Sequence, residues 1–344
     1  MSDSQAAAPP IPPHVQVIQI ATGCWASRIL YVAAKLGLAD HLASGPKTAE
    51  AIAGPTGAHA PSLARVLRTL ASMGLFMEDA EHRFSLTPLG ESLKSGAPGA
   101  ARATVLTLAG DTFWRGWEHV LYSVQTGKPG FDKALGEPIF DWLGKHPDEA
   151  SLFSETMIGF HGMEPDAVVE AYDFSGFKTI VDVGGASGHL VTTVLAKHRG
   201  LRGILFDLPH VVKDAPALIA ARGLADRITI ESGSFFDGVP KGGDCYVLSH
   251  IIHDWSEAQC LAILGHCRRA MSPNGKVLVI ETVLPLGNDP HPGKMLDMMM
   301  LVGPGGQERT EDEYKTLLSK AGFRLQRVKP TQSMVSVVEA TPES

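Results

Sequence analysis

The sequence has few cysteines, and their arrangement does not build a structural site. There are four in 344 residues, Cys24, Cys245, Cys260 and Cys267, and no two of them form a C-x-x-C pair. Four scattered thiols are too few to stabilise a chain of this length by disulfide bonds. We therefore exclude the small disulfide-rich class and expect reduced thiols in a cytoplasmic protein.

An excess of positive charge is also missing. The formal net charge is −7, and the isoelectric point is near 6.0. Proteins that bind nucleic acid rely on basic patches that neutralise phosphates, so a polyanionic partner is disfavoured. With 44% hydrophobic and 19% charged residues, the chain has the composition of an ordinary globular protein, and its length allows two domains.

The sequence predicts neither a secretory signal nor a membrane span. Its first residues, MSDSQAAAPPIPP, lack a basic segment and an apolar core, and their Pro and Ala content predicts a disordered tail over 1–13. The longest apolar stretch, around 15–39, contains Arg28 and Lys35 and falls short of a membrane helix. No membrane partner is expected.

The segment after the tail has the order of a winged-helix domain. Apolar periodicity predicts three helices and then two strands, over 15–38, 48–54, 60–74 and 75–93. A helix such as 62–73 could enter a DNA major groove, but it offers only Arg65 and Arg68. An interaction or dimerisation module is therefore favoured over DNA binding.

The rest of the chain changes from helices to alternating strands and helices. Residues 100–172 are predicted to be mainly helical. The strand-like runs are 179–183, 203–208, 228–232, 245–251 and 276–282. The helical segments between them are 188–199, 211–222 and 257–271. This alternation is typical of a doubly wound, mostly parallel sheet.

We therefore predict an α/β protein in three parts. A tail over 1–13 precedes a mainly helical, winged-helix-like interaction or dimerisation domain over 14–105. A Rossmann-like domain follows over 106–344.

A glycine-rich loop joins the first predicted strand to the next helix. VDVGGASGHL contains Gly184, Gly185 and Gly188, which allow a tight turn and close approach of the backbone to a ligand. The spacing differs from G-x-G-x-x-G, and the loop has no basic residue for phosphates. Asp207 ends the second strand, where a carboxylate can accept hydrogen bonds from ribose hydroxyls. A cofactor with a ribose but no pyrophosphate, such as S-adenosylmethionine, is favoured over a purely structural turn.

Three ionisable residues follow the ends of later strands. His253 follows the fourth strand, Glu281 ends the fifth, and Glu308 lies in the loop GPGGQERT. If the fourth and fifth strands pair, their ends are about 4.8 Å apart, so His253 and Glu281 could face one cleft. An imidazole beside a carboxylate is a general base with its tautomer fixed.

Helix capping offers a structural alternative for this region. Ser256-x-x-Gln259 and Thr310-x-x-Glu313 both match the capping box. Capping explains the polar residues around His253 but not His253 itself. Taken together, at the edge of the sheet where doubly wound proteins place their sites, the three ionisable residues favour catalysis.

No metal site is expected from the sequence. His250 and His253 are close, but no cysteine or carboxylate set follows them at ligand spacing, and zinc needs three or four converging ligands.

Residues that could bind the acceptor include part of a methionine-rich run. This run, MLDMMMLVG at 295–303, is either core filler or the lining of a pocket for a flat aromatic ligand. The predicted acceptor-binding residues are Trp114, Met157, Phe160, His161, Asp254, Met299, Met300 and Gly303.

The ordered motifs resemble one known family. VDVGGASG, LFDLPHVV, GSFFDGVP, LSHIIHDWSEAQC, GKVLVIETVLP and GGQERTEDEY resemble the S-adenosylmethionine-dependent O-methyltransferases of the plant caffeic-acid and bacterial natural-product (hydroxyindole O-methyltransferase-like) type. The resemblance covers nearly the whole chain and implies a homodimer, formed through the winged-helix region. It also implies that His253 removes the acceptor proton, while Glu281 and Glu308 flank and orient it.

The resemblance also implies how S-adenosyl-L-methionine is held. Asp182, Gly184 and Asp207 would bind its methionine and ribose portions. Ser234 stands where plant members have aspartate at the adenine end, and Ser249 stands where they have lysine. The full predicted cofactor-binding set is Asp182, Gly184, Gly185, Asp207, Leu208, Ser234, Phe235 and Ser249.

The predicted activity is transfer of the cofactor's methyl group to a hydroxyl of a small aromatic, phenolic or polyketide-like acceptor, by in-line displacement. This scheme requires no metal.

One alternative is a relative that binds the cofactor but catalyses hydroxylation or a pericyclic reaction, because fold does not fix function. The intact catalytic set disfavours it. A winged-helix DNA-binding regulator is the other alternative, and the negative net charge disfavours that one.

Overall fold

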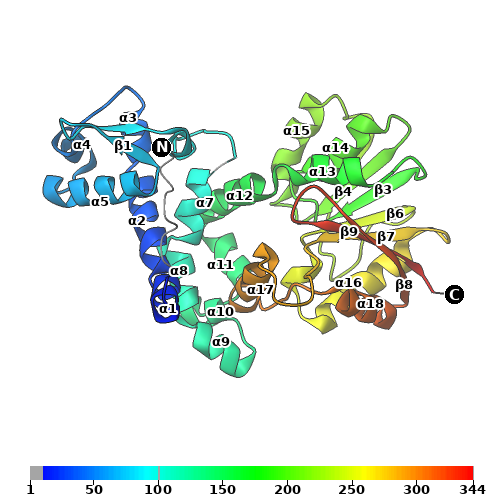
Figure 1. Cartoon of the computed structure of the whole chain (residues 1–344). Helices are drawn as coiled ribbons and strands as arrows, with labels where there is room; N and C mark the ends of the chain where they lie inside the picture. Colours follow the sequence, from blue (N-terminus) through cyan, green and yellow to red (C-terminus); the bar gives the residue numbers. More distant parts are fainter. Residues whose placement is uncertain (1–10, 100, 344) are drawn as a thin grey trace, which may run out of the picture. The chain divides into compact units, whose positions relative to one another are not determined.

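The computed structural model describes residues 11–99 and 101–343, so most of the predicted disordered tail lies outside the described residues. The chain divides into two compact units (Figure 1). The first comprises Met1–Trp114 and His146–Phe160, and the second comprises Arg115–Lys145 and His161–Ser344. The domain boundary at 105/106 stays a prediction, because these units are not contiguous in sequence.

The first unit begins with two helices where one was predicted. They are α1 (Pro13–Ala21) and α2 (Gly23–Lys35). The break falls at Thr22, whose hydroxyl donates to the carbonyl of Ile18 at 3.0 Å, a contact that bends helices. Contrary to the sequence-based expectation, Pro13–Lys35 is long and apolar enough to cross a membrane, although length and composition are the only support. A core helix of a soluble protein can have the same length and apolar composition.

The winged-helix order predicted for this unit is confirmed. Its elements are α3 (Leu38–Leu42), α4 (Ala49–Thr56), α5 (Ala60–Ser72), β1 (Phe76–Glu78), β2 (Phe84–Leu86) and α6 (Pro88–Glu91). The two strands pair antiparallel, and Phe76 and Phe84 bury their rings against Ile52, Leu67 and Leu70. A small apolar core therefore holds the hairpin on the helices.

The middle of the chain is helical, as predicted. Its helices are α7 (Ala101–Leu108), α8 (Asp111–Glu118), α9 (Val120–Thr126), α10 (Gly130–Leu135), α11 (Ile139–Lys145), α12 (Pro147–His161) and α13 (Glu164–Ala171). Within the first unit, a buried hydrogen bond of 2.8 Å between the hydroxyls of Thr107 and Thr156 joins α7 to α12.

The second unit is built on a seven-stranded sheet of order β5-β4-β3-β6-β7-β9-β8. The strands are β3 (Thr179–Val183), β4 (Arg202–Asp207), β5 (Ile228–Ser232), β6 (Cys245–Ser249), β7 (Lys276–Glu281), β8 (Phe323–Pro330) and β9 (Ser336–Pro342). The first five are parallel and match the predicted strands, whereas the antiparallel β8 and β9 were not predicted.

Strand order reverses direction beside β3, because β3 lies between β4 and β6. In doubly wound sheets, ligands bind outside the carboxyl ends of the strands at such a switch point. The glycine loop follows β3 and the segment containing His253 follows β6. The topology therefore brings the two predicted halves of the site to one edge of the sheet.

Helices cover both faces of this sheet (Figure 1). They are α14 (His189–Lys197), η1 (Val212–Asp214), α15 (Ala215–Ala221), η2 (Ile252–Asp254), α16 (Glu257–Ala270), α17 (Pro292–Val302) and α18 (Glu311–Lys320). Alternate residues of one strand enter two separate cores. On β3, Ile180 packs with residues of α13, α14 and α15, and Val181 packs with residues of α16 and α18.

Close packing of α14 on β4 gives a test of this fold. A Cβ added at Gly203 would lie 2.7 Å from Cγ2 of Val191, so Gly203→Ala is expected to lower the free energy of unfolding by about 1–3 kcal/mol. Urea denaturation measures the change. Gly200→Ala is the matched control, since its Cβ would meet no atom within 4 Å. Equal unfolding free energies for the two variants would contradict this packing.

Candidate active site

His253 lies in the short helix η2, just beyond the carboxyl end of β6. Its Nδ1 is 2.7 Å from Oε1 of Glu308, and the two side chains are 7% and 0% exposed. When the imidazole is neutral and Glu308 is ionised, the carboxylate can only accept, so the single imidazole proton is on Nδ1 and the lone pair is on Nε2. The structure therefore brings two of the predicted catalytic residues into contact, and their catalytic roles stay predictions.

Glu281 contacts the backbone that carries His253, and its predicted flanking role stays a prediction. Its Oε1 accepts hydrogen bonds from the backbone N–H groups of Ile251, at 3.0 Å, and His253, at 3.1 Å. Its Oε2 accepts from the hydroxyl of Tyr314 at 2.6 Å. The strands β6 and β7 do pair, with Ser249 opposite Ile280. The fully buried Glu281 thus acts on the backbone that carries His253.

Three residues that the sequence analysis did not select also hold the segments that carry His253 and Glu308. Tyr314 closes the contacts of Glu281, and the guanidinium of Arg309 donates to the carbonyl of Ile252 at 3.3 Å. The carboxylate of Asp297, on α17, accepts from the backbone N–H of Glu308 at 2.9 Å. No spacing rule distinguishes them: Tyr314 matches a core position of α18, and Arg309 looks like a loop charge.

The charges around the imidazole change its acidity strongly. Burial by itself lowers the pKa of His253, but the negative charge of Asp254, the hydrogen bond to Glu308 and the charge of Glu281 together raise it to about 10. Oδ1 of Asp254 lies 3.7 Å from Nε2. Burial raises the pKa of Asp254 to about 6, against the opposing charge of His253. The site is an imidazole surrounded by carboxylates.

The glycine loop after β3 is tightly built. Gly184 has φ +73°, a conformation that favours glycine, and a Cβ there would lie 2.3 Å from Cδ1 of Ile251. A Cβ on Gly185 would lie 2.6 Å from the carboxyl carbon of Asp182. Oδ1 of Asp182 is buried without a hydrogen-bond partner among the described residues, and burial raises the pKa of this carboxyl to about 7.

Asp207 is held at the carboxyl end of β4. Its Oδ2 accepts from the backbone N–H of Ala186 at 2.9 Å, and its Oδ1 accepts from that of Leu208 at 2.7 Å. The anchored, partly exposed carboxylate and the orphaned oxygen of Asp182 fit a ligand that has both donor groups and a ribose. The carboxylate oxygens of Asp207 and Asp182 therefore suit a nucleoside cofactor without pyrophosphate.

The remaining predicted cofactor residues lie on neighbouring segments. Ser249 ends β6, and Ser234 and Phe235 follow β5. The hydroxyl of Ser234 accepts from the backbone N–H of Phe236 at 3.2 Å, so it shapes its own turn. The ring of Phe235 packs edge-on against Trp255, with centroids 5.8 Å apart.

Two family models match most of the chain. A model of the O-methyltransferase domain matches residues 117–324, and a model of the O-methyltransferase dimerisation domain matches residues 18–95. The chain is 47% identical to a phenazine O-methyltransferase of Lysobacter antibioticus over 95% of both chains. The chain belongs to the O-methyltransferase family. Members of this family use S-adenosylmethionine as their methyl donor.

Solved structures of relatives have the same fold. The mitomycin 7-O-methyltransferase MmcR is 36% identical, with a TM-score of 0.91, covering 96% of this chain and 97% of that one. NcsB1, from neocarzinostatin biosynthesis, was solved with S-adenosylmethionine and a naphthoic acid. It is 34% identical, with a TM-score of 0.84, covering 98% of this chain and 100% of that one. Two curated relatives, each 33% identical, are N-methyltransferases.

The predicted acceptor residues of the methyltransferase belong to both compact units. Trp114, Met157 and Phe160 are in the first, where the guanidinium of Arg28 lies 5.1 Å from the ring centroid of Trp114. The others are in the second unit: His161, Asp254, Met299, Met300 and Gly303. Of the two methionines, Met300 is buried and Met299 is half-buried. Their roles in binding stay predictions.

The contact between Tyr314 and Glu281 gives a second test. Tyr314→Phe removes the donor of Oε2 from a buried carboxylate, so we expect the free energy of unfolding to fall by about 1–3 kcal/mol. Chemical denaturation of the whole chain measures the change. Tyr122→Phe, at a partly exposed position on α9, is the control and is expected to change stability by less than about 0.5 kcal/mol. Equal stability of the two variants would mean that the hydroxyl does not support Glu281.

Proposed function

We propose that the methyltransferase moves the methyl group of S-adenosylmethionine to a phenolic hydroxyl of a planar aromatic acceptor, with His253 as the general base. The observation that carries this proposal is the buried contact of 2.7 Å between Nδ1 of His253 and Glu308. In the neutral imidazole this contact leaves a lone pair on Nε2, at the edge of the sheet where the cofactor loop also lies. Glu308 would orient the imidazole, and Glu281 would fix the backbone beneath it.

Proton transfer is well matched in this arrangement. A phenol has a pKa of about 10, and the carboxylates raise the pKa of His253 to about 10. A raised pKa makes the neutral imidazole a stronger base, which favours transfer of the phenolic proton to Nε2. The sulfonium cofactor supplies an activated methyl group. The remaining task of the protein is to hold the acceptor oxygen in line with the methyl carbon and the sulfur.

The cofactor would be held at the ends of β3 and β4. Asp207 would accept hydrogen bonds from the ribose hydroxyls, because its carboxylate is fixed by two backbone amides. Asp182, with its unpartnered oxygen, would receive a donor from the methionine portion. Gly184 would let the loop backbone approach the ligand, since its φ of +73° favours glycine and the side chain of Ile251 leaves no room for a Cβ. The roles of Leu208, Ser234, Phe235 and Ser249 at the adenine end remain predictions.

Relatives support an aromatic acceptor. Curated relatives act on a phenazine, an aminohydroxybenzoate and a dihydroxynaphthoate. We infer a hydroxylated phenazine or a ring system of similar size as the first acceptor to test. We also infer a homodimer formed through the region matched by the dimerisation model, and a cytoplasmic location.

N-methylation is the second candidate function, because two relatives methylate nitrogen. A tertiary aromatic nitrogen carries no proton, so its methylation needs no base. The pair of His253 and Glu308 favours oxygen for this chain. NMR of the product made with S-adenosylmethionine labelled with ¹³C in its methyl group distinguishes the two, because a methyl carbon bonded to oxygen and one bonded to nitrogen have different chemical shifts.

Replacing the base tests the proposal directly. We expect His253→Ala to lower kcat on the acceptor by about 10²–10⁴-fold, the usual contribution of a general base. The acceptor comes from a panel of hydroxyphenazines, naphthols, flavonoids and quinones assayed with labelled S-adenosylmethionine. The variant should keep the thermal shift that S-adenosylhomocysteine produces in the unsubstituted protein. Full turnover in His253→Ala would exclude His253 as the base, and no thermal shift in either protein would exclude the cofactor.

The pH dependence of kcat/KM tests the role of Glu308. The neutral imidazole is the active form, so kcat/KM should rise with pH towards the raised pKa of His253. Glu308→Gln removes a charge that stabilises the imidazolium, so we expect the rising limb to move to lower pH and kcat to fall. Glu311→Gln, at an exposed position at the start of α18, is the control and should leave the limb in place. An unmoved limb in Glu308→Gln would mean that Glu308 does not set the acidity of His253.

A further inference from the structure

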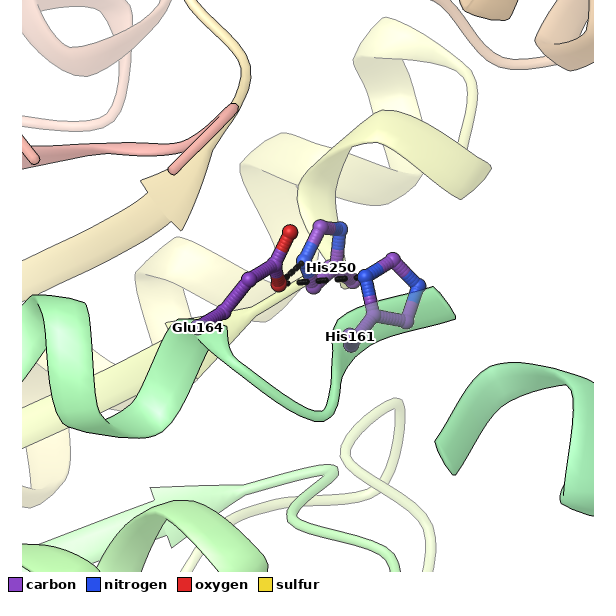
Figure 2. A group of neighbouring side chains, drawn as sticks. All are labelled: His161, Glu164 and His250. Atoms are coloured by element: carbon purple, nitrogen blue, oxygen red, sulfur yellow. Dashed lines mark hydrogen bonds and ion pairs between the residues drawn. The ribbon is translucent and has the colours of Figure 1, made fainter. Parts of the chain in front are cut away.

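A second group of ionisable side chains lies beside the proposed base. His161 ends α12, Glu164 begins α13, and His250 follows β6 (Figure 2). Nδ1 of His161 is 3.0 Å from Oε2 of Glu164, and Nε2 of His250 is 2.6 Å from the same oxygen. The two imidazoles therefore direct one nitrogen each at one carboxylate oxygen.

We propose that His161, Glu164 and His250 form a binding site for a divalent transition-metal ion of the Zn²⁺ class. One ligand atom from each residue lies within 4.8 Å of the other two. Two imidazoles and one glutamate are a known zinc-binding set, and imidazole nitrogen also suits related transition metals. Three protein ligands leave at least one coordination position for water or another oxygen ligand.

The geometry needs little change to accept an ion. With bonds of about 2.0–2.1 Å and tetrahedral angles, neighbouring ligand atoms lie about 3.3 Å apart. The present separations of 3.0 and 2.6 Å are slightly shorter, so each nitrogen would move from the oxygen by less than about 1 Å. The side chains are also shielded from solvent, with 22% of His161, 9% of Glu164 and 14% of His250 exposed.

Two features of His250 are unexpected in a purely structural cluster. Its φ of +54° lies in the left-handed region, which costs a residue with a side chain about 1–2 kcal/mol. Its Nδ1 is also buried without a hydrogen-bond partner among residues 11–99 and 101–343. A network selected only for stability would satisfy the polar groups it buries. Strained residues with incomplete hydrogen bonding are more typical of binding sites.

The ion would lie next to the proposed catalytic base. The ring centroids of His250 and His253 are 5.2 Å apart, and those of His161 and His250 are 3.8 Å apart. The proposal departs from the sequence-based expectation of no metal, which considered only His250 and His253. It is independent of the proposed methyl transfer, whose scheme does not use an ion.

Metal titration of the whole protein tests the site. The protein is treated with a chelator, dialysed and titrated with Co²⁺, and d–d absorption in the visible range reports coordination; Zn²⁺ then competes for the site. We expect one Co²⁺ per chain. Because loss of outer-shell partners alone weakens metal sites 10–100-fold, Glu164→Gln should weaken binding by at least about 100-fold. His161→Gln is the second variant, in case the first does not fold.

The control is a histidine–glutamate pair elsewhere in the chain, which lacks the second imidazole of the proposed metal site. His82 and Glu78 lie on the surface of the first unit, with Nδ1 to Oε1 at 2.9 Å and the His82 side chain 82% exposed. His82→Ala should therefore bind Co²⁺ like the unsubstituted protein. Circular dichroism and the thermal shift with S-adenosylhomocysteine check that each variant is folded. Absence of stoichiometric binding, or equal binding by a folded Glu164→Gln or His161→Gln variant, would overturn the proposal.

Discussion

The site depends on one buried carboxylate. Beyond β6, the backbone N–H groups of Ile251 and His253 leave the sheet ladder and donate to a side chain instead of a strand. Glu281, the last residue of β7, accepts both and is held in turn by the hydroxyl of Tyr314. Because unsatisfied buried amides cost about 1–3 kcal/mol each, this carboxylate fixes the turn and hence the direction of the imidazole.

The same constraint links the two groups of histidines. The ladder between β6 and β7 ends where the N–H of His250 donates to the carbonyl of Ile280 at 3.1 Å. The chain must then turn sharply to bring the next amides to Glu281, and His250 takes up that turn with its left-handed backbone. The turn directs the side chain of His250 to Glu164 and that of His253 to Glu308. One strand end thus supplies both groups.

Sequence patterns predicted those parts of the molecule that local order determines. Continuous apolar runs identified the five parallel strands, and His253 stood out because capping by Ser256 and Gln259 could not explain it. β8 was missed because the bulge between Leu325 and Arg327 interrupts the alternation of apolar and polar residues along the strand. Contacts between distant segments could not be predicted from sequence patterns. Pairing of β6 and β7 predicted that Glu281 lies near His253, but it did not predict that the carboxylate accepts from the backbone and not from the imidazole. Glu164 is 86 residues from His250, too far for any spacing rule.

The charges of the site make stability and activity depend on pH in opposite directions. The carboxylates raise the pKa of His253 from its ordinary value of about 6.5 to about 10. A group with a raised pKa stabilises the folded state fully below its unfolded pKa, and this contribution is lost as pH rises through the folded pKa. Proton abstraction, however, needs the neutral imidazole, which becomes abundant over the same rise. The folded state therefore loses the attraction between imidazolium and carboxylates in the pH range where the base becomes available. The contacts of Glu281 with Tyr314 and the backbone do not depend on that charge, so they can hold the turn while His253 gives up its proton.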